Sequence, residues 1–291
     1  MFLADQWQDY EVIDTGDGEK LERWGTVILR RPDPQVIWPK VNAALWAQAQ
    51  ARYIRSDRGG GSWDIYQPLP DHWHIACMGF HFIVRPTGFK HMGLFPEQAA
   101  NWAYMSGLVR KRVSEGRPVK VLNLFGYTGG ASVVCAGAGA HVTHVDAAKG
   151  MTLWARENCA LSGLPETAFR FIVEDVMSFI RREMRRGRRY EGILMDPPSY
   201  GRGPGGEVWK LQDELYALVS ACIQILSEEG LFLVINGYTT GFQASVLYNI
   251  INKSLVNARG GIADARELCL PVTTGGVLPC GTTGRWQAHE T

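Results

Sequence analysis

The stretch that decides the fold is Val121-Leu-Asn-Leu-Phe-Gly-Tyr-Thr-Gly-Gly130, a mostly apolar run that stops at a glycine-rich turn. A second run, Glu191-Gly-Ile-Leu-Met195, stops in the same way at Asp196-Pro-Pro-Ser-Tyr200. Each pattern is typical of a buried strand followed by a tight turn. In open parallel α/β sheets, ligands bind just beyond the carboxyl ends of the strands. The two turns therefore predict one binding site at the carboxyl edge of a parallel sheet.

From about residue 90 the chain alternates between helix and strand patterns. The expected strands are 119–125, 140–146, 169–174, 190–195 and 230–236, and the expected helices are 97–115, 129–138, 148–162, 175–186, 207–227 and 241–255. Such a succession of βα units predicts a mostly parallel sheet with helices on both faces. The last two strands, 265–270 and 283–288, have no helix between them, so we expect an antiparallel hairpin at the sheet edge. Together these elements predict a Rossmann-like α/β fold with a mostly parallel, seven-stranded sheet.

The front of the chain lacks this alternation. Strands are expected at 24–29 and 36–38, a hairpin at 73–77 and 80–84, and a helix in the alanine-rich segment 41–55. We therefore predict a small β-rich N-terminal region at 1–85 and a main α/β domain at 86–291.

The composition is that of a globular protein, with 46% hydrophobic and 20% charged residues among 291 and a net charge of +1. No apolar run approaches the roughly 20 residues that span a bilayer, and the first residues do not resemble a secretory signal. The six cysteines form no C-x-x-C pair, and His72 and His74 have no third ligand, so we expect reduced thiols and no metal site. A cytoplasmic protein is expected.

Three successive strand ends carry groups that suit a nucleoside cofactor. The loop 125–130 lacks the G-x-G-x-x-G pattern that approaches a pyrophosphate. S-adenosylmethionine (SAM) has no phosphates and needs amide donors and carbonyl acceptors instead. Asp146 ends the next strand, 20 residues after Gly126, the spacing at which an acid binds ribose hydroxyls. Asp175 ends a third strand, where it can meet the adenine amino group, although a helix cap is the alternative for both aspartates.

The turn after the fourth strand suits the acceptor of a methyl group. Two consecutive prolines fix φ and remove two backbone donors, so the carbonyls of residues 196 and 197 are rigid acceptors. Such acceptors orient a planar amino group beside the methyl sulfonium, and Tyr200 is placed to stack on a flat substrate. A plain turn is the alternative. The candidate catalytic residues are Asp196, Pro197, Pro198 and Tyr200. Residues 201–206 are expected to form a mobile lid, with a plain flexible loop as the alternative.

These motifs resemble those of bacterial class I SAM-dependent methyltransferases that modify large-subunit ribosomal RNA by forming 5-methylcytosine or by modifying guanine. The resemblance rests on Asn123–Gly129, Val145-Asp146, Glu174-Asp175, Met195–Pro198 and Lys90–Gln98 with Asn101, and it covers roughly residues 85–255. It implies SAM as the cofactor, S-adenosylhomocysteine as its product, and an RNA substrate, with ribosomal RNA favoured. It also implies Phe95, Glu97 and Gln98 as SAM contacts. The other predicted cofactor contacts are Phe125, Gly126, Tyr127, Thr128, Gly129, Gly130, Asp146, Ala147, Asp175, Val176 and Asp196.

Two features depart from that group. Its usual N-terminal RNA-binding PUA domain has no obvious match in the first 75 residues. In addition, 5-methylcytosine chemistry needs a cysteine thiolate that adds to the base, whereas Ser199 follows Pro198 here and Cys280 is the only loop cysteine near the expected open edge. Transfer to an exocyclic nitrogen needs no such nucleophile.

Other functions stay open at this point. They are a small-molecule or protein methyltransferase of the same fold, an NAD-dependent oxidoreductase, and a non-catalytic RNA-binding module. The missing dinucleotide pattern and the terminal hairpin argue against the oxidoreductase, and the presence of both loops argues against the non-catalytic module. The sequence does not specify an oligomeric state.

Overall fold

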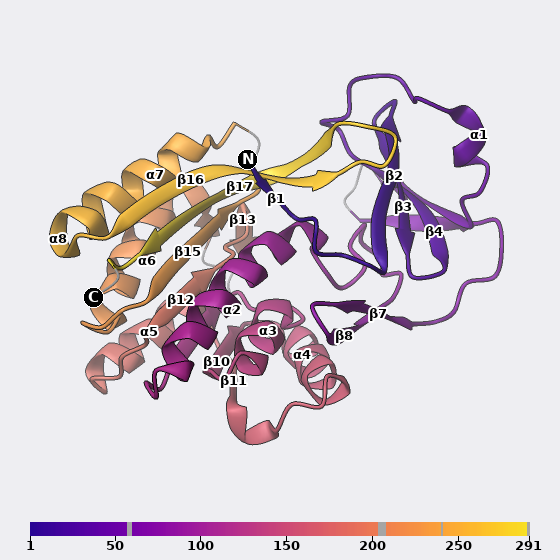
Figure 1. Cartoon of the computed structure of the whole chain (residues 1–291). Coiled ribbons are helices and arrows are strands. Elements are labelled where there is room, and N and C mark those ends of the chain that lie inside the picture. The colour runs from indigo at the N-terminus through magenta and orange to yellow at the C-terminus, as the bar shows by residue number, and fades with distance from the viewer. Residues whose placement is uncertain (57–59, 203–207, 240, 290–291) are drawn as a thin grey trace. The chain divides into compact units, whose positions relative to one another are not determined.

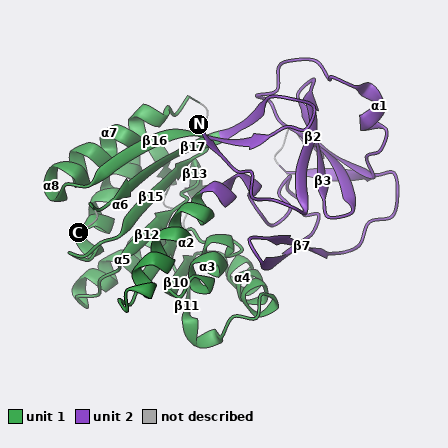
Figure 2. Ribbon diagram, viewed as in Figure 1, with its two compact units in different colours: residues 1, 101–267, 281–291 green, residues 2–100, 268–280 purple. Residues whose placement is uncertain are grey.

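A computed structural model describes residues 1–56, 60–202, 208–239 and 241–289. They fall into two compact units (Figure 2), the first made of residues 1, 101–267 and 281–291 and the second of 2–100 and 268–280. Strands β16 (Ile262–Pro271) and β17 (Val277–Gln287) contribute residues to both units. The domain boundary expected between residues 85 and 86 stays a prediction.

The first unit contains most of a sheet with the strand order β1-β16-β17-β15-β12-β9-β10-β11 (Figure 1). Its parallel part consists of β9 (Lys120–Leu124), β10 (His141–Asp146), β11 (Phe169–Val173), β12 (Gly192–Met195) and β15 (Phe232–Gly237). Strand β17 pairs antiparallel with β15. The seven expected strands are all present, and β1 (Phe2–Leu3) adds an eighth by pairing with β16. The Rossmann-like α/β fold with its terminal hairpin is therefore confirmed.

Helices cover both faces of this sheet (Figure 1). One face carries α2 (Ala99–Ser114), α3 (Gly130–Gly137) and α4 (Lys149–Leu161), and the other carries α5 (Val176–Arg185), α6 (Leu211–Ile225) and α7 (Ala244–Ile251). After α7 the chain continues through residues 252–256 into α8 (Asn257–Arg259). Every residue of β12 and β15 is buried. Strands covered on both faces read as continuous apolar runs, which is why the sequence indicated them clearly.

The second unit contains the β-rich region that the sequence predicted. Its five-stranded sheet is formed by β2 (Tyr10–Gly16), β3 (Glu19–Trp24), β4 (Val27–Pro32), β5 (Ala51–Arg55) and β6 (Gly61–Ile65). A separate hairpin pairs β7 (Trp73–Cys77) with β8 (Phe80–Val84), as expected.

Three local predictions for this unit were wrong. Only Ala43–Trp46 of the segment 41–55 is helical (α1), and residues 51–55 form β5. The strand expected at 24–29 is interrupted at Gly25, where φ is 64° and the chain turns from β3 into β4. Residues 36–38 are not a strand, because the Val36 amide donates to the Asp33 carbonyl in a turn. For residues 51–55, pairing with β4 and β6 overrides the local pattern.

The segment after the Asp-Pro-Pro turn also differs from expectation. Residues 200–202 (β13) pair antiparallel with residues 208–210 (β14), and α6 begins at Leu211 rather than near 207. The lid expected at 201–206 falls mostly on residues 203–207, which lie outside the described part of the chain.

Candidate active site

The carboxyl ends of four neighbouring strands bring the predicted residues of the first unit to one edge of the sheet. Across the order β12-β9-β10-β11, Met195 lies opposite Leu124, Leu124 opposite Val145, and Asp146 opposite Val173. The turns at 196–200, 125–130, 146–148 and 174–176 therefore start side by side. This is the arrangement that the sequence predicted for a ligand site.

The glycine-rich loop 125–130 has a strained backbone. Phe125, Tyr127 and Gly129 have φ values of 55°, 51° and 82°, all in the left-handed region. For a residue other than glycine that conformation costs on the order of 1–3 kcal/mol. Strain of this kind persists only where the surroundings enforce it, and it is concentrated at ligand-binding sites. Phe125 and Tyr127 thus mark this loop as a candidate clamp for a cofactor.

Three glycines of the loop are needed because their neighbours leave no room for a side chain. A Cβ on Gly126 would lie 2.4 Å from Cε1 of His144, and one on Gly130 would lie 2.4 Å from Cζ2 of Trp102. A Cβ on Gly129 would lie 2.9 Å from Cβ of Ala155. The loop backbone therefore packs directly on β10, α2 and α4, which fixes its course.

Asp146 ties this loop to the next one. Its Oδ2 accepts a hydrogen bond from the Tyr127 amide at 2.9 Å, and its Oδ1 accepts one from the Ala148 amide at 2.8 Å. The N-cap of α4 is Ala148, so Asp146 is not the N-cap residue of that helix. Ala147 lies between Asp146 and Ala148 and is exposed. Burial raises the pKa of Asp146, and the two amides partly offset that rise. Each carboxylate oxygen keeps a lone pair for a further donor.

Thr128 and Asp175 have structural contacts of their own. Thr128 is buried, and its carbonyl accepts a hydrogen bond from Nδ2 of Asn158 at 2.8 Å. Asp175 is the N-cap of α5 and accepts from the Ser178 amide at 2.8 Å, and Val176 is the first, buried residue of that helix. The helix-cap alternative is therefore confirmed for Asp175. Its contact with the cofactor stays a prediction.

The Asp-Pro-Pro turn is held from two sides by residues that the sequence did not indicate. The Pro198 carbonyl accepts a hydrogen bond from Nε1 of Trp209 at 2.6 Å, and Oγ of Ser199 accepts one from the Thr239 hydroxyl at 2.7 Å. The Trp209 ring also lies 5.8 Å from the ring of Phe125, between centroids. Trp209 thus links the turn to the glycine-rich loop.

The first and last residues of this turn have different surroundings. The Asp196 amide donates to the Leu124 carbonyl at 3.3 Å, so the turn begins against the end of β9. Tyr200 lies on β13 and is 51% exposed, which leaves its ring accessible for stacking. Their part in catalysis, with that of Pro197, stays a prediction.

The remaining predicted contacts, Phe95, Glu97 and Gln98, belong to the second unit. Residues Pro96–Gln98 form a short 3-10 helix with Phe95 as its N-cap, and Glu97 and Gln98 are buried. Burial raises the pKa of Glu97, while the charges of Lys20 and Arg31 lower it in part. Their role as cofactor contacts also stays a prediction.

Comparison with known proteins assigns the family. Residues 29–242 match the family described as S-adenosylmethionine-dependent methyltransferase. The chain belongs to that family. A solved structure of a SAM-dependent methyltransferase from Agrobacterium tumefaciens is 39% identical, with a TM-score of 0.93, and the match covers 98% of this chain and 92% of that one.

Two curated methyltransferases are also similar over much of the chain. Ribosomal RNA large subunit methyltransferase K/L of Shewanella frigidimarina is 31% identical over 67% of this chain, and the match covers 25% of that protein. Ribosomal RNA large subunit methyltransferase K of Neisseria meningitidis serogroup B is 27% identical over 88% of this chain and 71% of its own length. The chain thus spans about a quarter of the K/L relative that it matches.

The residues of this methyltransferase fit SAM as the cofactor. The backbone of the loop 125–130 is strained at Phe125 and Tyr127, and strain of this kind is concentrated at ligand-binding sites. The Asp146 carboxylate has acceptor capacity left for ribose hydroxyls. No dinucleotide pattern is present, in keeping with a cofactor that lacks a pyrophosphate.

The thiols of the methyltransferase are poorly suited to act as nucleophiles. Five of the six cysteines are buried, and Cys280 is partly buried. Burial raises the pKa of Cys135 and Cys159 to about 12 and that of Cys280 well above its ordinary value, so the reactive thiolate form is disfavoured. In the first unit, Cys135, Cys159 and Cys222 lie within helices α3, α4 and α6. None of these three follows the carboxyl end of a strand.

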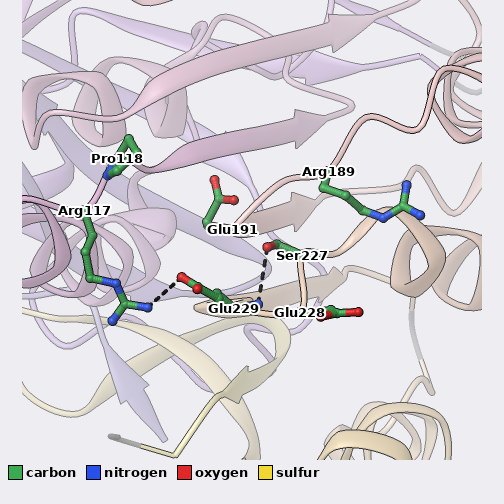
Figure 3. Close-up of a pocket in the computed structure, with 7 residues that line it drawn as sticks. All are labelled: Arg117, Pro118, Arg189, Glu191, Ser227, Glu228 and Glu229. Carbon is green, nitrogen blue, oxygen red and sulfur yellow. Dashed lines mark hydrogen bonds and ion pairs between the residues drawn. The ribbon is translucent and has the colours of Figure 1, made fainter.

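A pocket of about 470 Å³ lies at the opposite edge of the same sheet (Figure 3). Its lining residues directly precede β9, β12 and β15, namely Arg117, Pro118, Arg189, Glu191, Ser227, Glu228 and Glu229. Arg117 is turned toward Glu229, with an N–O distance of 2.7 Å. This pocket stands at the amino ends of the parallel strands, so it is separate from the site described above.

Among the helices of the described residues, none has both the length and the apolar character needed to cross a membrane.

Proposed function

We propose that this methyltransferase transfers the methyl group of SAM to a base in RNA, with ribosomal RNA as the favoured substrate. The observation that carries the proposal is the register Met195–Leu124, which starts the Asp-Pro-Pro turn directly beside the glycine-rich loop. When bound, SAM supplies a methyl group on a positively charged sulfur. A site that places donor and acceptor side by side gains most of its rate from positioning.

The residues divide into two groups in this proposal. The glycines of the loop 125–130, Thr128 and Asp146 hold the cofactor. Asp196, Pro197 and Pro198 offer acceptors to a planar amino group, and Tyr200 stacks on the base. Trp209 keeps the turn in place by donating to the Pro198 carbonyl.

We infer that the acceptor atom is a nitrogen of the base. Methylation at C5 of a pyrimidine needs a thiolate that first adds to C6, and burial raises the pKa of Cys135, Cys159 and Cys280, which disfavours their thiolate forms. A nitrogen acts directly: its bond to the methyl carbon forms while the sulfur–carbon bond breaks, and its proton is lost to the surroundings.

The support for RNA comes from two sources. The curated relatives from Shewanella and Neisseria are named for ribosomal RNA of the large subunit. The exposed Tyr200 ring beside rigid carbonyl acceptors also suits a flat, amino-bearing base. We accordingly propose a cytoplasmic location, where such RNA is found.

The test is methylation of ribosomal RNA from a strain that lacks the gene, with radiolabelled SAM and mass spectrometry of the nucleosides. We expect label in one N-methylated nucleoside. D196N is expected to lower the rate by about 100-fold because it replaces the charged side-chain carboxylate beside the two backbone carbonyls with a neutral amide. E228Q, which likewise replaces an acid by its amide but in the pocket at the opposite edge, is the matched control and keeps the wild-type rate.

Label found only in a small molecule or a protein would replace this proposal with another methyltransferase function. Formation of 5-methylcytosine, or a covalent complex with 5-fluorocytosine RNA, would show that the nitrogen assignment is wrong.

A further inference from the structure

A row of buried polar side chains lies beneath the glycine-rich loop. Asn123 on β9 and His144 on β10 are register partners, and Ser132 lies in the first turn of α3 above them. Nδ2 of Asn123 donates to Oγ of Ser132 at 2.9 Å, and Nδ1 of His144 is 3.0 Å from the same oxygen. All three residues are at most 2% exposed. One hydroxyl thus joins two strands to the helix that follows the loop.

His144 is also in direct contact with the loop. Its ring occupies the space next to Gly126 in which a side chain would stand, 2.4 Å from the position of a Cβ. Gly126 lies between Phe125 and Tyr127, the two residues with left-handed backbone. The imidazole therefore supports the loop at the centre of its strained part.

The charged form of this imidazole is disfavoured. Burial and the charge of Arg156 lower the pKa of His144 to about 4. Nε2 of His144 has no hydrogen-bond partner, so its polar contact with the protein runs through Nδ1 and Ser132. The buried Nε2 carries a cost that an apolar residue would avoid. A histidine here therefore calls for an explanation other than packing.

We propose that His144 is a positioning residue for the cofactor, which holds the loop 125–130 in its SAM-binding conformation through Gly126 and Ser132. The inference rests on the proposed function, because SAM binding is what the loop conformation serves. The Tyr127 amide, which donates to Asp146, lies one residue after Gly126. Loss of the imidazole is therefore expected to disturb two parts of the cofactor site at once. These are the glycine-rich loop and the Asp146 carboxylate that we assign to the ribose.

The test compares three variants by calorimetric titration with SAM and by thermal melting. H144L removes the imidazole. T143V is the matched control: Thr143 is the neighbouring buried residue of β10, its side chain points to the other face of the sheet, and its hydroxyl pairs with Tyr190. H144N is the conservative variant, since an asparagine amide reproduces Nδ1 and its bond to Ser132.

We expect H144L to weaken SAM binding by about tenfold or more and H144N to restore most of it. T143V is expected to lower the melting temperature but to leave the dissociation constant for SAM within about twofold of the wild type. In a methylation assay, H144L raises the KM for SAM while kcat at saturating SAM changes little.

Two results would overturn the inference: H144L binding SAM as tightly as the wild type, or T143V losing affinity to the same extent. Calorimetry needs no RNA, so this outcome is independent of the substrate. A wild-type protein that binds SAM but does not methylate RNA would contradict the proposed function, while the dissociation constants of the variants would still decide the role of His144.

Discussion

At the scale of single residues, Gly126 shows why the loop needs glycine. The position is not left-handed, so backbone conformation does not explain the residue; the space is taken by the His144 ring instead. Substitution forces either the loop or the imidazole to move. In a packed interior, such overfilling costs about 1–3 kcal/mol.

We therefore predict that G126A lowers the free energy of unfolding by about 2 kcal/mol and abolishes measurable SAM binding. The matched control is G107A, because Gly107 lies in the interior of α2 with no atom near the position of a Cβ. An alanine there favours the helix by about 0.5–1 kcal/mol. Urea denaturation and SAM titration of both variants check the prediction, and a G126A protein that binds SAM normally would contradict it.

At the scale of secondary-structure elements, the sequence predicted the parallel strands well and the N-terminal region poorly. Runs such as 192–195 and 232–235 are apolar throughout because helices cover both faces, so a local pattern identifies them. The segment 41–55 is rich in alanine, yet residues 51–55 pair with β4 and β6, and Tyr53 packs edge-on against Trp63. Those partners are not visible in the local sequence.

Only some residues of the candidate site could likewise be predicted from the sequence. The strand ends at Asp146, Asp175 and Asp196 could be predicted because each aspartate closes a short strand pattern, which is apolar throughout only before Asp196. Trp209, Ser132 and His144 could not, since their contacts depend on the sheet register and on a loop that returns to the turn. The sequence offered a capping role and a cofactor contact for Asp175; the start of α5 confirms the capping role, and the cofactor contact stays a prediction.

Helix α5 is attached to the sheet by a buried carboxylate. Glu183 is fully buried and accepts hydrogen bonds from Arg170 on β11 and from the Tyr190 hydroxyl. Burial alone raises the pKa of Glu183, but the bonds from Arg170 and Tyr190 lower it below its ordinary value. A lowered pKa means that this carboxylate stabilises the fold above about pH 4.5 and that its contribution is lost as the pH falls further.

We predict that E183Q lowers the free energy of unfolding at pH 7 by about 3 kcal/mol, because it breaks a buried ion pair. R186Q is the control, since Arg186 is 55% exposed and lies 3.7 Å from Glu183; its effect is expected to stay below about 1 kcal/mol. Denaturation at pH 7 and pH 4 checks the sign: the gap between E183Q and the wild type narrows at pH 4. Equal losses of unfolding free energy in both variants would show that the burial of Glu183 adds nothing to its contribution.

At the scale of the whole molecule, binding of SAM is coupled to stability. A ligand that binds only the folded protein stabilises it by RT ln(1 + [L]/Kd), which is about 2.7 kcal/mol at a concentration of 100 times Kd. The glycine-rich loop and Asp146 both belong to the first unit, so the transition in which that unit unfolds is the one that shifts. For a protein of this size the shift is about 5 °C.

We accordingly predict that SAM and S-adenosylhomocysteine each raise the melting temperature of this transition and that NAD does not. The reason lies in the loop 125–130, which lacks the glycine spacing for a pyrophosphate but has the acid 20 residues after Gly126 that a ribose needs. Differential scanning calorimetry at rising ligand concentration measures the effect, and ATP controls for general binding of adenine nucleotides. A shift with NAD as large as that with SAM would mean that the loop accepts a pyrophosphate and that the assignment of the cofactor contacts around Asp146 is wrong.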